Sequence, residues 1–318
     1  MPAEPLVCVR DLSVVFGNSI HAVNGVDLDL AAGEVLGVLG ESGSGKSVTL
    51  RALLRILPAR ARMGGSIRVD GRDVLAMAEG EIEDYRGGVV SMIFQEPMLA
   101  FDPVFTIGDQ IAESVVRHRG VGRAAARARA LEMLEHVRIP NARRRLDAYP
   151  HEMSGGMRQR AMIALALACG PKLLLADEPT TALDATVQIQ ILLLLRELQR
   201  ELGMSVIFVT HDVGVACEVA DRIAVMYAGR IVETGAVGDV MRTPRHPYTS
   251  GLLSSIVRGE LKGQRIEAIP GSPPDLARLP PGCSFEPRCR HARPDCRDGF
   301  PAARTLDGGR VVRCVLET

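Results

Sequence analysis

Short apolar runs alternate along the chain with segments of helical spacing. Each run is bounded by turn residues and is rich in Val, Ile, Leu or Phe, which favours buried strands. The clearest runs lie at residues 33–40, 89–94, 172–177 and 205–210. Helical patterns occupy 47–57, ended by Pro58, and 187–203, ended by Gly203. This alternation predicts an α/β domain with a substantial parallel sheet.

Two regions depart from that alternation. Residues 106–148 hold two amphipathic helical patterns without an apolar strand between them, which predicts a helical insertion in the α/β core. After residue 243 the chain becomes rich in Pro, Gly and Arg, as in "IPGSPPDLARLPPG". That composition predicts an appendage of roughly 75 residues with little regular structure. We therefore expect a domain at 1–243 and a C-terminal extension at 244–318.

Composition narrows the class of protein. The chain has 318 residues, of which 47% are hydrophobic, so it can bury a sizeable core. Its 38 basic and 38 acidic residues give a net charge of zero, which offers no electrostatic case for binding nucleic acid. No basic-then-apolar leader is visible, and no apolar run reaches the roughly 18 residues of a membrane helix. We expect a soluble, cytoplasmic protein whose thiols stay reduced.

The stretch "GESGSGKS" (40–47) fits the pattern G-x-x-x-x-G-K-[ST] between a predicted strand and a predicted helix. The backbone N–H groups of such a loop cradle an anion, aided by the positive end of the helix. Lys46 can reach the terminal phosphates of a nucleotide, and Ser47 can ligate Mg²⁺. The predicted phosphate-binding residues are Gly40, Glu41, Ser42, Gly43, Ser44, Gly45, Lys46, Ser47 and Val48.

A second motif supplies two acids. "LLLADE" (173–178) is an apolar strand that ends in Asp177 and Glu178, at the edge where ligands bind in parallel sheets. Asp177 can hold Mg²⁺ through water or Ser47, and Glu178 can polarise a water for attack on a γ-phosphate. Together the two motifs predict a Mg²⁺-dependent nucleotide hydrolase or kinase.

The stretch "MSGGMRQR" (153–160) resembles the signature of the ABC ATPase family, which usually has Leu where this chain has Met153. Ser154, Gly155 and Gly156 open a predicted helix whose N-terminus can bind an anion. In the family, that anion is the γ-phosphate held by the phosphate loop of a second subunit. The resemblance disfavours a generic P-loop kinase, and it implies a head-to-tail dimer with ATP between the subunits.

Further positions match the family in order along the chain. Gln95 follows a predicted strand and matches the glutamine loop, which touches Mg²⁺ and the attacking water. Asp184 is the acid of "ALD", which matches the loop that crosses the dimer interface. His211 matches the switch histidine on the γ-phosphate, and Phe16 matches the aromatic residue that stacks on adenine. The resemblance thus implies Lys46, Gln95, Glu178 and His211 as catalytic residues, and Ser47, Gln95 and Asp177 as Mg²⁺ ligands.

The resemblance becomes narrower in three segments. "SGGMRQRAMIALALACGPKLLLADEPTTALD", "HPYTSGLLSSI" (246–256) and "CSFEPRC" (283–289) are similar to the ATP-binding subunits of oligopeptide and dipeptide ABC importers. This implies a P-loop ABC core with a helical signature subdomain at about 97–165, an N-terminal antiparallel β-subdomain and the C-terminal extension. Related subunits that serve nickel or glutathione share much of this pattern, so the transported solute stays open.

This relationship implies several partners. The helical insertion and the Gln95 loop would hold the cytoplasmic helices of two transmembrane permease subunits. A second ABC ATPase subunit would complete the dimer, and an extracytoplasmic solute-binding protein would act indirectly. The chain would then lie on the cytoplasmic face of the plasma (inner) membrane. The alternative of another class is an ABC ATPase that acts on DNA or the ribosome. Such proteins usually carry two cassettes or a long coiled coil, whereas this chain has one cassette, so no nucleic-acid partner is expected.

Four cysteines fall in the C-terminal extension, at Cys283, Cys289, Cys296 and Cys314. Their spacing lacks the paired knuckles of structural zinc sites. Four loosely spaced thiolates in a reducing compartment fit a [4Fe–4S] cluster, and some of the related importer subunits carry one there. Zinc, and free or disulfide-linked thiols, are the alternatives. The other cysteines lie in apolar segments and are predicted to be inert core residues: Cys8, Cys169 and Cys217.

Overall fold

The computed structural model describes residues 4–17, 19–179, 185–254 and 269–316. The chain forms two compact units, each built from segments that are distant in sequence. The first unit comprises Met1–Ala31, Val35–Leu75 and Val209–Thr318. The second unit comprises Ala32–Glu34 and Ala76–Phe208.

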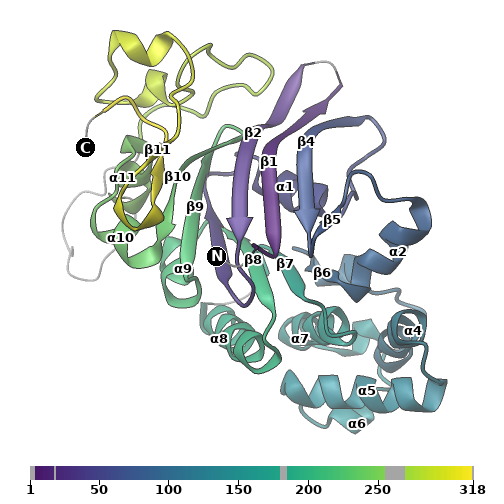
Figure 1. Cartoon of the computed structure of the whole chain (residues 1–318). Helices are drawn as coiled ribbons and strands as arrows, with labels where there is room; N and C mark the ends of the chain where they lie inside the picture. Colours follow the sequence, from purple (N-terminus) through teal and green to yellow (C-terminus); the bar gives the residue numbers. More distant parts are fainter. Residues whose placement is uncertain (1–3, 18, 180–184, 255–268, 317–318) are drawn as a thin grey trace. The chain divides into compact units, whose positions relative to one another are not determined.

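An antiparallel sheet forms the N-terminal part of the first unit (Figure 1). Its strand order is β2-β1-β4-β5, with bounds β1 Val7–Phe16, β2 Ile20–Leu30, β4 Ala61–Val69 and β5 Arg72–Asp73. Apolar residues of β1 alternate into the core until Arg10 and Asp11, which are both exposed. A bulge occurs there, and Asp11 takes a φ of 48°. A Cβ on the facing Gly65 would lie 2.3 Å from the Asp11 carbonyl oxygen, so the bulge requires glycine at that position.

The rest of the first unit contains strands in the order β11-β12-β10-β9-β3. Strands β3 and β9 run parallel, whereas β9, β10, β12 and β11 pair antiparallel. The strand bounds are β3 Val35–Leu39, β9 Arg222–Tyr227, β10 Arg230–Ala236, β11 Arg304–Thr305 and β12 Val311–Val312. The helices of this unit are α1 Lys46–Leu53, α9 Val213–Val219, α10 Val237–Arg242 and α11 Pro247–Ser254.

Helix α1 is shorter than the helical spacing over 47–57 predicts. It ends at Leu53, and Arg55 takes a left-handed φ of 50°. The turn is closed by hydrogen bonds from the N–H groups of residues 54–56 to the carbonyls of Arg51 and Ala52. Pro58 therefore lies beyond the helix rather than at its end.

Beyond residue 269 the regular elements are short, as the Pro and Gly content predicts. They are β11, β12 and the 3-10 turns η3 Glu286–Arg288, η4 Pro294–Arg297 and η5 Asp307–Gly309. The segment packs against β9 and α11 through a buried cluster that includes Tyr227, Tyr248 and Phe285. This cluster provides an apolar core for a segment that has little regular secondary structure.

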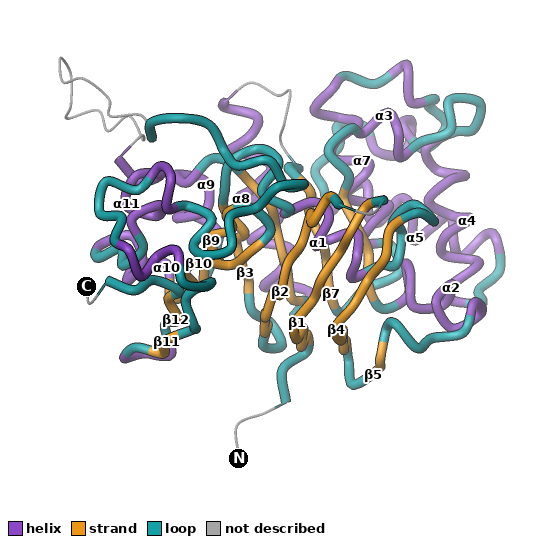
Figure 2. The backbone as a smooth tube through the Cα atoms, turned by 90° about the horizontal axis from the view of Figure 1, so that it is seen from above, coloured by secondary structure: helices purple, strands orange, loops and turns teal. Residues whose placement is uncertain are grey.

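The second unit holds the adjacent strands β8-β7-β6 (Figure 1), of which β6 and β7 are parallel. Helical segments, drawn in purple in Figure 2, make up much of the rest of this unit. The strand bounds are β6 Val90–Ile93, β7 Leu173–Asp177 and β8 Ser205–Thr210, the last of which runs across the unit boundary. Every residue of these strands is buried, which explains why they read as continuous apolar runs in the sequence.

Within residues 94–172, all of which the structure describes, the regular elements are helical, in agreement with the predicted insertion. They are α3 Pro97–Ala100, α4 Ile107–Arg119, α5 Arg123–His136, α6 Ala142–Arg145, the 3-10 turn η1 Pro150–Glu152 and α7 Gly155–Leu167. Helices α2 Glu79–Gly88 and α8 Ala185–Leu202 complete the unit. No helix in the described segments is both long and apolar enough to cross a membrane.

Candidate functional site

The phosphate loop, residues 40–47, joins the buried strand β3 to helix α1. Gly45 is the N-cap of α1 with a φ of 100°, and no side chain caps the helix. A Cβ at Gly45 would lie 2.3 Å from the carbonyl oxygen of Ala22, so only glycine fits. The first N–H groups of α1 lie at the positive end of the helix dipole, which favours an anion.

Lys46 is buried, and its ammonium group stays next to the loop. Its Nζ donates hydrogen bonds of 2.8 Å to the carbonyl oxygens of Gly40 and Glu41. The Lys46 ammonium and the backbone N–H groups at the start of α1 thus belong to the same short segment. This combination suits a polyphosphate, whose charge is spread over several oxygen atoms.

Two residues that sequence analysis did not single out contact the loop at Glu41. The Arg288 guanidinium forms an ion pair with the Glu41 carboxylate, at 2.7 Å from Nη1 to Oε2. The Glu41 N–H donates to the Tyr248 hydroxyl at 2.9 Å. Both residues come from segments that follow the predicted ATPase domain, Tyr248 from α11 and Arg288 from η3.

In the second unit, Asp177 ends strand β7 and is 1% exposed, and Glu178 follows at the strand end. Glu178 has a φ of 46°, in the left-handed region that non-glycine residues rarely adopt. Such a conformation costs roughly 1–2 kcal/mol and points to a functional constraint when it occurs in a potential site. The backbone thus leaves the extended strand conformation directly after Asp177.

The signature segment begins helix α7. Ser154 is the N-cap, and its Oγ accepts a hydrogen bond from the Met157 N–H at 3.4 Å. Ser154 is exposed, whereas Met153 before it is buried, which explains why an apolar residue other than Leu is accepted there. The N-cap residue of α7 is therefore accessible to solvent.

Gln159 on α7 is a second contact that sequence analysis missed. Its side chain is 1% exposed, and its Nε2 donates to the carbonyl oxygen of Pro179, directly after Glu178. This hydrogen bond ties the signature helix to the segment that carries the candidate general base. The only sequence signal was a polar residue on the apolar face of a predicted helix.

The remaining predicted site residues lie at the ends of strands. Phe16 is the last residue of β1 and is half-buried. Gln95 follows β6 and is exposed, and His211 follows β8 and is exposed. Phe16, the phosphate loop and His211 belong to the first unit, whereas Gln95, Ser154, Asp177 and Glu178 belong to the second. Asp184 lies outside the described residues.

The four cysteines of the C-terminal extension line one small cavity of about 10 Å³, together with His246 and His291. All seven cysteines of the chain lie in described segments and are free thiols. Burial raises the pKa of Cys283 to about 11, and it also raises the pKa of Cys289 and of Cys314. Among the described residues, no three His, Cys, Asp or Glu side chains are placed to hold a single metal ion.

Of the other three cysteines, only Cys169 is buried, whereas Cys8 and Cys217 are half-buried. The prediction that all three are core residues is therefore too broad. Burial raises the pKa of the Cys8 thiol, which disfavours its reactive thiolate form.

Comparison with known proteins identifies two matching families. Residues 23–181 match the ABC transporter family, and residues 232–296 match the C-terminal region of oligopeptide/dipeptide transporters. The oligopeptide transport ATP-binding protein OppD of Salmonella typhimurium is 48% identical, over 98% of this chain and 94% of that protein. A putative peptide import ATP-binding protein of Brucella abortus is 51% identical, over 99% of this chain and 96% of that protein.

Solved structures show the same architecture. A dimeric, post-hydrolysis structure of the ATP-binding cassette MJ0796 with ADP and Pi matches with a TM-score of 0.65 at 30% identity. It covers 73% of this chain and 98% of the cassette. The cbiO1 structure from Clostridium perfringens, part of an ABC transporter complex, matches with a TM-score of 0.66 at 27% identity, over 76% of this chain and 92% of that one.

Proposed function

This chain belongs to the ABC transporter family, and we propose that its ATP hydrolysis powers the import of di- and oligopeptides through membrane permease subunits. One observation carries the choice of solute. The segment after the ATPase core matches the C-terminal region of oligopeptide/dipeptide transporters, and relatives named for peptide import align along the whole chain. We further propose that the chain works on the cytoplasmic face of the plasma (inner) membrane.

The residues of the site would divide the chemistry as follows. Lys46 and the N–H groups of the phosphate loop hold the β- and γ-phosphates. Glu178 accepts a proton from the attacking water, while Gln95 and His211 orient that water and the γ-phosphate. Mg²⁺ would neutralise charge on the phosphates, and the carboxylate of Asp177, the hydroxyl of Ser47 and the amide oxygen of Gln95 are the oxygen donors it prefers. Phe16 would stack on adenine.

The hydrolysing unit would be a dimer of two ABC ATPase subunits. The start of α7 supports this, because the N-cap Ser154 is exposed, Gly155 and Gly156 are half-buried, and a helix N-terminus favours an anion. A matching cassette structure is itself described as dimeric. We propose that these three residues, and Asp184, act on the ATP held by the other subunit.

A partly apolar hollow in the helical subdomain supports a permease contact. A cavity of about 660 Å³ is lined by residues that include Phe105, Val116 and Val121. Large apolar side chains are exposed along the same segments, at Met98, Val104, Phe105, Val116 and Val121. Of these residues, Phe105, Val116 and Val121 line the cavity, and exposed apolar surface of this kind is typical of interaction sites. We propose that cytoplasmic helices of the two permease subunits dock here, with a solute-binding protein acting on the far side of the membrane.

We also propose a [4Fe–4S] cluster at Cys283, Cys289, Cys296 and Cys314. The donor set fits, because four thiols border one cavity. Among the described residues that line it, Glu286 is the one carboxylate. Each thiolate of a cluster binds a different iron, so the sulfurs need not be within reach of one ion. The cavity of about 10 Å³ has room for roughly one water molecule, so the thiols would have to move outward.

Metal analysis tests the cluster. Protein purified without oxygen should contain iron and sulfide in stoichiometric amounts and absorb visible light. The variant Cys296→Ser should lose both, whereas Cys169→Ser, in the second unit, should keep them. A colourless wild-type protein with stoichiometric zinc would contradict the cluster and favour a zinc site.

Uptake measurements test the transported solute. Cells lacking this chain should lose uptake of labelled di- and tripeptides and keep uptake of nickel and glutathione. Loss of nickel or glutathione uptake alone would instead favour one of those solutes. Affinity purification from membranes should recover permease subunits; recovery of ribosomes or DNA without any permease would favour the non-transport class of ABC ATPase.

A further inference from the structure

Glu41, the second residue of the phosphate loop, is held on three sides. Its carboxylate receives two hydrogen bonds from the Arg288 guanidinium, at 2.7 Å and 3.0 Å. Its N–H donates to the Tyr248 hydroxyl at 2.9 Å. Its carbonyl oxygen accepts from the Lys46 ammonium at 2.8 Å. Two of these three contacts come from residues beyond the predicted ATPase domain.

Arg288 is fixed in place rather than lying loosely on the surface. Its side chain is 6% exposed, compared with 28% for Glu41. Its Nε donates to the Pro270 carbonyl at 2.9 Å, and its Nη1 also donates to the Tyr227 hydroxyl at 3.2 Å. A two-pronged guanidinium–carboxylate pair with such support has one geometry, unlike a surface ion pair.

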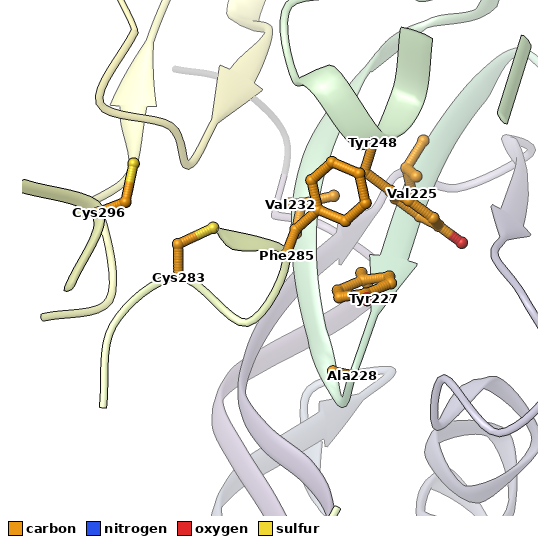
Figure 3. Close-up of a cluster of buried hydrophobic side chains, with 8 residues drawn as sticks. All are labelled: Val225, Tyr227, Ala228, Val232, Tyr248, Cys283, Phe285 and Cys296. Carbon is orange, nitrogen blue, oxygen red and sulfur yellow. The ribbon is translucent and has the colours of Figure 1, made fainter. Parts of the chain in front are cut away.

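Tyr248 belongs to an aromatic cluster with Tyr227 and Phe285 (Figure 3). The Arg288 guanidinium carbon lies 5.8 Å from the ring centroid of Tyr227 and 6.0 Å from that of Phe285. The ring centroids of Tyr227 and Tyr248 are 4.5 Å apart, and Phe285 lies 5.3 Å from Tyr227 and 5.4 Å from Tyr248. Cys283 belongs to the same buried cluster. The extension therefore contacts the phosphate loop through side chains that are themselves supported by a buried aromatic cluster.

We propose that Arg288 and Tyr248 are positioning residues for ATP binding, which act through Glu41 on the phosphate loop. The inference rests on the proposed ATP site. An acidic side chain in a loop that binds a triphosphate repels the ligand unless its charge is compensated. Arg288 compensates that charge and fixes the carboxylate, while Tyr248 fixes the backbone of the same residue. The extension thus sets the affinity of the loop for nucleotide without touching the nucleotide itself.

The test measures ATP hydrolysis and thermal unfolding on the full-length chain, assembled with its partner subunits. Arg288→Gln should raise the KM for ATP about tenfold, the scale of one uncompensated charge near a protein surface, and leave kcat nearly unchanged. Arg288→Lys keeps the positive charge but loses the two-pronged guanidinium contact. Its KM for ATP should lie between those of the wild type and Arg288→Gln. Glu41→Gln in the Arg288→Gln background should restore most of the affinity, because no uncompensated carboxylate remains.

Two further variants distinguish an effect on the position of Glu41 from an effect on the folding of the chain. Tyr248→Phe keeps the ring and removes the hydroxyl that receives the Glu41 N–H, and should raise the KM roughly fivefold. Arg313→Gln breaks another ion pair of the extension, with Asp27 on β2 at 2.9 Å, and should leave the KM unchanged. Because Tyr248→Phe preserves the apolar packing, it also reports on the contact if Arg288→Gln lowers the yield of folded protein.

Three results would overturn the inference. The first is an unchanged KM in both Arg288→Gln and Tyr248→Phe. The second is a fall in kcat and melting temperature that the added Glu41→Gln does not rescue, which indicates a merely structural ion pair. The third is an equal effect of Arg313→Gln. A wild-type complex without ATP hydrolysis would instead refute the proposed function, so the two failures are distinguishable.

Discussion

Among single residues, Glu178 combines a place after a buried strand with a backbone conformation that is costly for an L-residue. Asp177 and Glu178 are adjacent in sequence, and in an extended strand their side chains would point to opposite faces. The left-handed φ of Glu178 shows that the chain leaves the strand at this point, which suits a general base beside a metal-binding carboxylate. This conformation supports the different roles that we propose for the two acids.

Replacing this carboxylate tests the assignment. Glu178→Gln should lower ATP turnover by about 10²–10⁴-fold, because the amide cannot accept the proton of the attacking water. ATP binding should persist, and the dimer should be trapped closed in gel filtration with ATP. Glu132→Gln, on the surface of α5, should behave like the wild type. Hydrolysis near the wild-type rate in Glu178→Gln would remove Glu178 as the general base.

Candidate site residues that belong to a local sequence motif could be predicted. Residues whose contribution depends on contacts with distant parts of the chain could not. The phosphate loop is eight consecutive positions whose residue types carry its chemistry, so the motif alone located it. Arg288 and Glu41 are 247 positions apart, and nothing in the local composition around Arg288 indicates its partner. Gln159 gives only the signal of a polar residue on an apolar helix face, because its contact depends on a hydrogen bond to the Pro179 backbone.

At the scale of elements, the buried strands were predicted well and the helix ends less well. Strands β6, β7 and β8 are buried along their whole length, so each gives an uninterrupted apolar run. The sequence predicts a later end for α1, because Arg55 adopts a left-handed conformation that is rare for arginine and cannot be predicted from its residue type. The bulge at Asp11 in β1 could not be predicted from the sequence for the same reason, because Asp11 also has a positive φ.

Helix α7 allows an element-scale test of action between subunits. Ser154→Arg puts a bulky side chain at the exposed helix start, and should block hydrolysis while the chain's own phosphate loop still binds nucleotide. The substitution also removes the N-cap, which costs about 1 kcal/mol, so Ser154→Ala serves as the control for cap loss alone. Ser154→Ala should keep more activity than Ser154→Arg. Loss of nucleotide binding by the isolated Ser154→Arg chain would argue that Ser154 acts within its own subunit.

For the whole molecule, each compact unit carries part of the predicted chemistry. The first unit contains the phosphate loop and the extension that holds Glu41. The second contains the strand-end acids, the signature helix and the helical subdomain. Sequence motifs could identify both sets of residues, because each motif is local. The proposed coupling of ATP hydrolysis to transport needs a surface that binds the permease subunits, and sequence motifs do not specify that surface. The exposed apolar residues near α4 are a candidate for it.

Phe105 provides the test of that surface. It is 56% exposed, so Phe105→Asp should change the free energy of unfolding by no more than about 0.5 kcal/mol. We expect the variant to lose permease subunits in affinity purification and to lose peptide uptake, while the isolated chain still binds ATP. Ile189→Asp on α8 is a matched control, because Ile189 is also 56% exposed and lies outside the hollow. If Phe105→Asp retains both permease binding and uptake, or if Ile189→Asp loses them equally, the permease does not dock on this part of the helical subdomain.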